Sequence, residues 1–367
     1  MLSSMDDYPL HQIAEPIRNV GTSDRNFYDR YYFNLHGCSD ELMLIMGMGQ
    51  YPNLAVQDAF TVVRRGDKHR VVRASRELDD RMDTTVGPHR VEVIEPLHKV
   101  RWITEPNEHG IACDVTWEGA IPAFLEPRQY IRKYGRVLFD TMRFAQTGYW
   151  TGTLEVGGEH FDITPDRWWG TRDRSWGVRP VGEKEAPGIR GAEGQMGGMW
   201  NYAPMQFPDF SILYILNEQD DGERPTEEAV RIWEDPSREP EWLGRPEFDH
   251  TLVPGTRTVS SSVLSFPEAP GGGFDVKVTP LTHVYITVGT GYGMEEDWGH
   301  GMYQGPLVVQ GVEHDMDELE KWAWYGVTDH VARFETGDTV GYGLHEHGFF
   351  GPFHKYGLER GDDTAPE

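Results

Sequence analysis

The stretch Ile111-Ala112-Cys113-Asp114-Val115-Thr116-Trp117-Glu118-Gly119 decides the fold class. Its odd-numbered side chains are apolar and its even-numbered ones are mostly polar, which is the alternation of a β-strand with one buried face. Similar short runs extend from it in both directions and are separated by turn residues. Residues 60–75 and residues 148–163 each predict a β-hairpin, the second with Gly157-Gly158 at its turn. The pattern indicates antiparallel β-structure.

Composition supports the same fold class. The 367 residues include 42 glycines and 24 prolines, together with 12 Trp, 16 Tyr and 16 Phe, so turn formers and strand-favouring aromatics are both abundant. A first series of strands is expected up to residue 178 and a second from residue 199 onward. We therefore predict two β domains, 1–180 and 196–360, joined by the Gly-rich segment 181–195. One short helix is expected over 315–325, where acidic residues occupy the first turn.

The charge balance excludes whole classes of partner. The chain carries 34 Lys plus Arg against 60 Asp plus Glu, a formal charge of −26, whereas nucleic-acid readers need a basic face. No apolar run reaches the roughly 18–20 residues that span a bilayer, and the first residues do not resemble a secretory signal. Two cysteines, Cys38 and Cys113, suit a reducing compartment. A cytoplasmic protein without a membrane span is expected.

The segment richest in chemical groups is Trp168-Trp169-Gly170-Thr171-Arg172-Asp173-Arg174-Ser175-Trp176-Gly177-Val178-Arg179-Pro180. On a strand, Arg172 and Arg174 share one face while Asp173 and Ser175 share the other. An acid flanked by tryptophans and turned toward an apolar cavity would have a raised pKa and would be able to donate a proton. The alternative is structural, with Asp173 paired to an arginine and the tryptophans packed in a core.

Residues 170–180 resemble the Gly-x-Arg-Asp-x-Ser-Trp-Gly-x-Arg signature of the carotenoid 1,2-hydratase (hydroxyneurosporene synthase) superfamily, which is similar to tocopherol cyclases. The segments 329–333 and 341–347 look like the Asp-His and Gly-x-Gly-x-x-Glu segments of that superfamily's second barrel. The resemblance implies two lipocalin-like antiparallel β-barrels in tandem. It also implies an acid that protonates an isoprenoid double bond, and the matching position is Asp173, with Trp176 beside it.

Aromatic side chains are the expected lining of such a site. Hydration or cyclisation of an alkene needs an acid near an apolar wall and aromatic faces that stabilise a carbocation, at roughly 0.5–2 kcal/mol for each cation–π contact. The predicted substrate-binding residues are Trp150, Trp169, Trp176, Trp200, Tyr202, His36 and Trp298. Aromatic residues also fill β cores, so each of them has a structural alternative.

The run His345-Glu346-His347 is a second candidate segment. On a strand both histidines point to one face, the spacing with which cupins hold a metal, but no acid follows at the position a cupin would need. No metal site is therefore expected. Glu346 and His347 are instead predicted to position water or to act as a base beside Asp173.

Three functions fit these observations. The preferred hypothesis is a cofactor-independent hydratase, dehydratase or cyclase acting on a small hydrophobic molecule of isoprenoid, terpenoid or steroid type. The same barrels would also suit a carrier of hydrophobic ligands that performs no chemistry. An acidic surface with stacking tryptophans is typical of carbohydrate-active β enzymes as well. The sequence fixes neither the substrate nor the oligomeric state.

Overall fold

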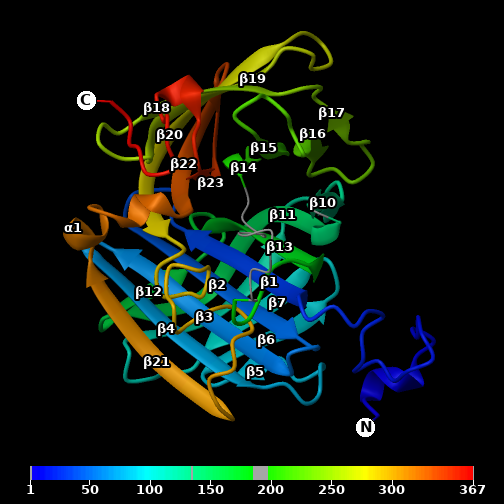
Figure 1. Ribbon diagram of the computed structural model, residues 1–367. Coiled ribbons are helices and arrows are strands. Elements are labelled where there is room, and N and C mark those ends of the chain that lie inside the picture. Colours follow the sequence, from blue (N-terminus) through cyan, green and yellow to red (C-terminus); the bar gives the residue numbers. More distant parts are fainter. Residues whose placement is uncertain (1, 134, 185–196, 367) are drawn as a thin grey trace.

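The computed structural model describes residues 2–133, 135–184 and 197–366, and these form two β-sheets (Figure 1). Sheet A contains β1 (Phe27–His36), β2 (Leu42–Tyr51), β3 (Val56–Arg65), β4 (Lys68–Glu77), β5 (Thr85–Val86), β6 (His89–Glu95), β7 (Lys99–Thr104), β8 (Ile111–Gly119), β9 (Phe124–Leu125), β10 (Gln129–Lys133), β11 (Arg136–Val156), β12 (Glu159–Ile163), β13 (Trp169–Val178) and β21 (Leu307–Asp315). Sheet B contains β14 (Gly198–Gln206), β15 (Phe210–Glu218), β16 (Thr226–Trp233), β17 (Glu241–Trp242), β18 (Glu247–Leu252), β19 (Val259–Phe266), β20 (Phe274–Tyr285), β22 (Thr328–Thr336) and β23 (Thr339–Phe350).

The pairing is antiparallel throughout both sheets, so the all-β prediction is confirmed. Sheet A runs in the order β21-β4-β3-β2-β1-β13-β11-β8-β7-β6-β5 and curls into a nearly closed barrel, and sheet B forms a half-barrel. β21 comes from the C-terminal half of the chain but pairs with β4, as the orange strand beside the blue ones shows in Figure 1. The predicted domain limits at 180 and 196 stay a prediction, and most of the predicted connection lies outside the described residues.

Helical structure is short. α1 (Met316–Leu319) is followed by the 3₁₀ turn η3 (Ala323–Tyr325), where one helix over 315–325 was expected. In the described part of the chain, two further 3₁₀ turns are η1 (Ser4–Asp7) and η4 (His354–Tyr356). The helix shortens because Lys321 and Trp322 bond three residues back rather than four, which tightens the turn. Within the described ranges, no helix has the length and apolar character that a membrane crossing requires.

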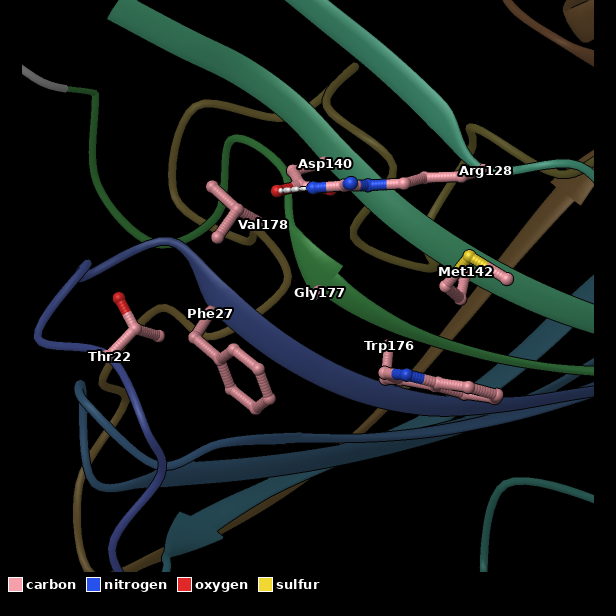
Figure 2. A pocket seen from close by; sticks show the side chains of 8 residues that line it. All are labelled: Thr22, Phe27, Arg128, Asp140, Met142, Trp176, Gly177 and Val178. Atoms are coloured by element: carbon pink, nitrogen blue, oxygen red, sulfur yellow. Dashed lines mark hydrogen bonds and ion pairs between the residues drawn. The ribbon is translucent and has the colours of Figure 1, made fainter. Parts of the chain in front are cut away.

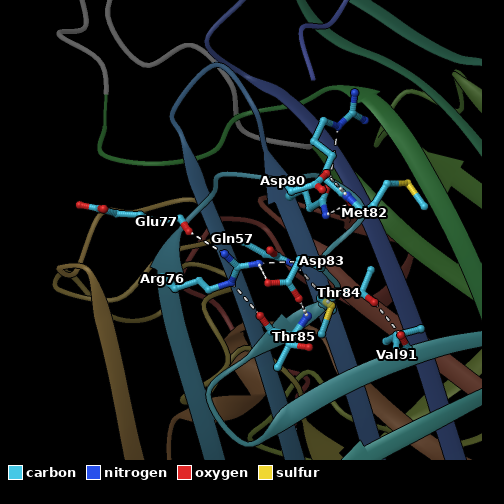
Figure 3. A network of polar contacts seen from close by, with 12 residues as sticks. Gln57, Arg76, Glu77, Asp80, Met82, Asp83, Thr84, Thr85 and Val91 are labelled. Atoms are coloured by element: carbon cyan, nitrogen blue, oxygen red, sulfur yellow. Dashed lines mark hydrogen bonds and ion pairs between the residues drawn. The ribbon is translucent and has the colours of Figure 1, made fainter. Parts of the chain in front are cut away.

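Arg76 on β4 forms hydrogen bonds to the backbone around β5 at one end of the sheet A barrel (Figure 3). Its guanidinium donates from Nε to the carbonyl oxygen of Thr85 on β5 at 2.7 Å and from Nη2 to that of Asp83 at 2.9 Å. The hydroxyl of Thr84 donates to the carbonyl oxygen of Val91 on β6 at 2.6 Å. The bonds of Arg76 hold the segment 83–85, at the far end of the sheet order, against β4, so the barrel is nearly closed.

The two faces of β1 and β13 belong to different cores. Phe33 on β1 packs with Trp102, Trp117 and Trp150 inside the sheet A barrel. Tyr32, the next side chain, packs instead into the cluster between the two sheets. Register pairing transfers this division to β13, because Arg172 lies opposite Phe33 and Asp173 opposite Tyr32. Asp173 therefore faces sheet B, and Arg172 faces the barrel interior.

β11 is much longer than expected. The sequence predicted a strand from Gly148, but β11 begins at Arg136 and pairs with β13 from Asp140 to Tyr149. The burial of segment 136–147 does not alternate, because its residues are partly or fully buried on both faces of the strand. This extension carries Arg143, which contacts the candidate site described below.

Gly170 lets β13 approach β1 closely. A Cβ atom at this position would lie 2.0 Å from the carbonyl oxygen of Asn34 and 2.9 Å from Nε1 of Trp150, and that indole donates to the same oxygen. Real Cβ atoms do not come this near to backbone. The glycine at the start of the signature segment is thus required by packing.

We predict that Gly170→Ala lowers the free energy of unfolding by about 2–4 kcal/mol, because backbone must shift at the junction of β1 and β13. Gly37→Ala is the control, since its Cβ would meet its nearest neighbour at an ordinary 3.5 Å, and a change within about 1 kcal/mol is expected there. Urea denaturation followed by circular dichroism measures both. Equal losses for the two variants would contradict the role given to Gly170.

Candidate active site

The candidate site lies between the two sheets and is centred on Asp173. Its side chain is 13% exposed, and the nearest cation is Arg143 on the neighbouring strand β11, with Nη1 4.0 Å from Oδ2. That separation is longer than a good charge-assisted hydrogen bond. Asp173 is therefore largely buried between the sheets, without a tight ionic partner among the described residues.

The closest ionic partner of Arg143 is Glu126 rather than Asp173. Nε of Arg143 lies 2.5 Å from the carboxylate of Glu126, a buried residue between β9 and β10. The same guanidinium lies over the ring of Tyr202 on β14 at 4.2 Å and 5.7 Å from the Trp200 ring. Arg143 thus joins a carboxylate of sheet A to an aromatic wall contributed by sheet B.

Sheet B contributes two more carboxylates. Asp329 on β22 lies opposite Glu346 on β23, and both face sheet A. The Tyr32 hydroxyl on β1 donates to Oδ2 of Asp329 at 2.7 Å, and the Trp200 indole N–H donates to Oε1 of Glu346. The contact between Tyr32 and Asp329 crosses from one sheet to the other and fixes their relative position at the site.

Burial controls the protonation of these acids. It raises the pKa of Asp173 to about 7, Arg143 opposes this rise, and the carboxylates of Glu126 and Glu346 add to it. Burial and the adjacent Glu346 hold the pKa of Asp329 well above its ordinary range. Burial alone would lower the pKa of Arg143, but the Glu126 carboxylate raises it well above the usual value.

Two oxygen atoms of this cluster are buried without a geometrically good hydrogen bond, as are several polar atoms elsewhere in the described residues. The Tyr202 hydroxyl is almost completely buried and, among the described residues, has no hydrogen-bond partner. Oδ1 of Asp329 is also buried and unpartnered within the same part of the chain. The carboxyl of Glu126 lies close enough to the Tyr202 hydroxyl, and that of Glu346 close enough to Asp329, to influence each other's protonation. The arrangement combines a proton donor, carboxylate acceptors and aromatic faces.

Only some of the predicted site residues meet here. Trp200 and Tyr202 form a stacked pair with centroids 6.3 Å apart and face Asp173 across the interface, and Glu346 joins them. Trp169 is on the same face of β13 as Asp173 but lies farther along, edge-on to Tyr342 of β23.

Three predicted lining residues are placed elsewhere. Trp150 is completely buried in the core of the sheet A barrel, and its indole donates to the Asn34 carbonyl oxygen. His36 is completely buried near the end of β1, where Nδ1 accepts a hydrogen bond from the backbone N–H of Cys38. Trp298 lies between β20 and β21 under the Arg73 guanidinium, 4.3 Å from the ring.

Trp176 faces away from Asp173. It projects from the barrel side of β13 and lines a hollow of about 490 Å³ together with Phe27, Met142 and Val178 (Figure 2). The hollow and the acid at Asp173 are therefore on opposite faces of one strand.

His347 also points away from the acids. It lies on the opposite face of β23 from Glu346 and packs inside sheet B, where its ring is nearly parallel to that of His330 at 5.1 Å. His345 and His250 belong to the same group of buried rings. Within the described ranges, no set of three or more His, Cys, Asp or Glu side chains has the geometry to hold a metal ion.

Sequence reasoning missed Glu126, Arg143 and Tyr32 as site residues. Glu126 lies outside the expected strands, and Arg143 lies in the part of β11 that was not expected to be a strand. Asp329 lies in the Asp-His segment 329–333 that was noted in the sequence, but it was not predicted as a site residue. Tyr32 could be found only from the register of β1 against β13.

Residues 2–359 match the sequence profile described as Family of unknown function (DUF8625). The chain belongs to this family. Among curated proteins, none matches its sequence.

Two solved structures share the fold of this DUF8625 chain. A putative AttH (NE1406) from Nitrosomonas europaea is 12% identical, with 93% of this chain and 98% of that chain covered and a TM-score of 0.56. CghA, solved with Sch210972, is also 12% identical, with 89% of each chain covered and a TM-score of 0.50. At these identities the likeness shows the fold alone, which is a lipocalin-like β-barrel architecture.

The raised pKa of Asp173 gives a prediction for stability. A carboxyl whose folded pKa is about 7 stabilises the fold at low pH, and this contribution is lost as pH rises from about 4 through 7. Asn mimics the protonated form, so Asp173→Asn should match the wild type near pH 4.5 and exceed it by about 2–4 kcal/mol at pH 8. Urea denaturation at both pH values measures this difference.

Asp114→Asn serves as the control for that comparison. Asp114 is on β8, and hydrogen bonds from Arg101 lower its pKa, so this variant should gain nothing over the wild type at pH 8. A difference between Asp173→Asn and the wild type that stays constant with pH would show that Asp173 titrates normally.

Glu126→Gln should lower the pKa of Asp173 below about 7. The change removes a negative neighbour that raises the pKa and leaves Arg143 without its close partner. The pKa is measured by ¹³C NMR titration of the aspartate carboxyl carbons, with the signal assigned from Asp173→Asn. Glu118→Gln, at an exposed site on β8, should not change it. A rise after Glu126→Gln would contradict the electrostatic arrangement.

Proposed function

We propose that this protein is a cofactor-independent hydratase, dehydratase or cyclase that acts on a small hydrophobic molecule of isoprenoid, terpenoid or steroid type. In this proposal the carboxyl of Asp173 donates a proton to a carbon–carbon double bond. The observation that carries it is a buried carboxyl whose pKa is raised to about 7 beside the Trp200 and Tyr202 rings. A general acid is most effective when its pKa lies near the working pH.

The proposed reaction begins at Asp173. Its proton adds to one alkene carbon, the electron pair of the double bond forms the new C–H bond, and the other carbon becomes a cation. The faces of Trp200 and Tyr202 would stabilise that cation. Arg143 lies over the Tyr202 ring in this structure, so the substrate would have to displace the guanidinium or use the Trp200 face.

The cation is then quenched in one of two ways. In hydration, water adds to the cation and gives its extra proton to Glu346, which is held by the Trp200 indole N–H. In cyclisation, a second double bond attacks and a neighbouring C–H loses its proton to the same carboxylate. Return of that proton to Asp173 restores the site. His347 faces the other side of β23, and the proposal gives it no step.

The likeness of residues 170–180 to the carotenoid 1,2-hydratase signature supports the same chemistry. CghA, solved with Sch210972, supports the idea that proteins of this fold bind organic ligands. A ligand carrier would share the fold and the aromatic surfaces, but it would not need a carboxyl that titrates near neutral pH. That acid is the reason for preferring an enzyme.

Turnover in heavy water tests the proposal. The protein is incubated in D₂O with a panel of acyclic and cyclic isoprenoid alkenes, and the products are analysed by mass spectrometry for deuterium on carbon. The wild type should incorporate one deuterium per turnover, and Asp173→Asn should lose at least about 10²-fold in rate, since general acid catalysis typically contributes 10²–10⁴-fold.

The wild-type rate should also fall as pH rises through about 7, because only protonated Asp173 is active. Asp114→Asn, far from the site on β8, should keep the full rate. If ligands bind but neither protein incorporates deuterium, the carrier hypothesis replaces this one. An unchanged rate in folded Asp173→Asn would remove Asp173 from the mechanism.

A further inference from the structure

The barrel side of β13 carries a cation that lacks a counter-charge. Arg172 is 3% exposed, and its Nε donates to Oε1 of Gln146 at 2.9 Å. Its Nη2 is buried without a hydrogen-bond partner, and no carboxylate among the described residues lies within ion-pair distance of it. Burying a charged group without a partner is costly, so an unpaired guanidinium inside a barrel calls for an explanation.

Neighbouring charges do not neutralise Arg172. Arg174, two residues along the same face, pairs with Asp29 of β1, and Arg81 lies 3.1 Å from the other oxygen of the same carboxylate. Two guanidiniums therefore share one acid, and the third has none. Burial lowers the pKa of Arg172 to about 10, and the positive charge of Arg174 acts in the same direction. This face is positively charged although the whole chain is strongly acidic.

Two aromatic rings lie between Arg172 and a hollow at the surface. The guanidinium carbon lies 5.4 Å from the Phe144 ring, and that ring lies 6.5 Å from the Trp176 ring. Trp176 lines the hollow of about 490 Å³ shown in Figure 2, together with the Phe27 ring, Met142 and the paired side chains of Arg128 and Asp140. A hollow of this size suits a small organic ligand.

We propose that the mouth of the sheet A barrel binds an amphiphilic monocarboxylate. Its carboxylate would pair with the free edge of Arg172, and its apolar chain would lie along Phe144 and Trp176 into the hollow. The two oxygens of a carboxylate match the planar fork of a guanidinium, and the aromatic rings match a hydrocarbon chain. This site is on the opposite face of β13 from Asp173 and does not depend on the function proposed for that acid.

Binding of decanoate and of 1-decanol tests the proposal, since the two differ only in the head group. Isothermal titration calorimetry below micellar concentrations should show decanoate binding to the wild type at least about tenfold more tightly than decanol. Arg172→Met should abolish this preference while leaving decanol binding in place. Trp176→Ala should weaken both ligands, because it removes chain contact but not charge. Arg101→Met, on β7 and paired with Asp114, is the matched control and should bind like the wild type.

Stability separates a ligand-binding arginine from a structural one. Without ligand, Arg172→Met should unfold at the same temperature as the wild type or at a higher one, because it removes an uncompensated buried charge. A variant that cannot fold would show that the guanidinium is structural and would overturn the proposal. Equal affinity of the wild type for decanoate and decanol, or no binding of either, would overturn it too, and neither result requires a variant.

Discussion

The position of β13 between β1 and β11 is the constraint on which both candidate sites depend. Hydrogen bonding on both edges fixes its register, and the alternation of side chains then leaves each residue only one direction. Asp173 must enter the interface between the sheets, and Arg172 must enter the barrel. A slip of one residue would exchange them, placing a guanidinium among the acids of sheet B. Gly170 protects this register, since only a residue without a side chain allows β13 to pack so closely on β1.

The interface between the sheets combines apolar packing with a small number of acids. Residues such as Ile45, Val62 and Leu344 supply the apolar contact that holds the sheets together. Within that contact, Asp329 is fully buried and Asp173 and Glu346 are largely buried, and Arg143 supplies a positive charge close to Asp173 but directed mainly at Glu126. Burying these acids lowers the free energy of unfolding, and the apolar contact around them offsets that loss. Because burial raises the pKa of Asp173 to about 7, that carboxyl can exchange protons near neutral pH.

Much of the architecture could be predicted from the sequence. Strand alternation, hairpin turns and the many aromatics were sufficient for the all-β class, and the Arg-Asp-Arg-Ser-Trp-Gly run drew attention to β13. It was harder to predict which face of a strand each side chain occupies, since Trp176 and Asp173 are near neighbours in sequence yet face different cores. Long-range pairing was harder still. Nothing local in Glu126 or Tyr32 shows that they approach Asp173 or Asp329, because those contacts arise only when distant strands align.

The pairing of β21 with β4 has a consequence for how the molecule assembles. About 230 residues separate the two strands, so the hydrogen-bonding edge of β4 stays open until most of the chain has left the ribosome. Contacts between such distant segments are entropically slow to form. An open edge of this kind attracts other extended chains, which makes the nascent N-terminal half a natural client for chaperones. Once β21 pairs with β4, the two halves of the chain are joined in one sheet. The N-terminal strands then cannot unfold at that edge unless β21 separates from them.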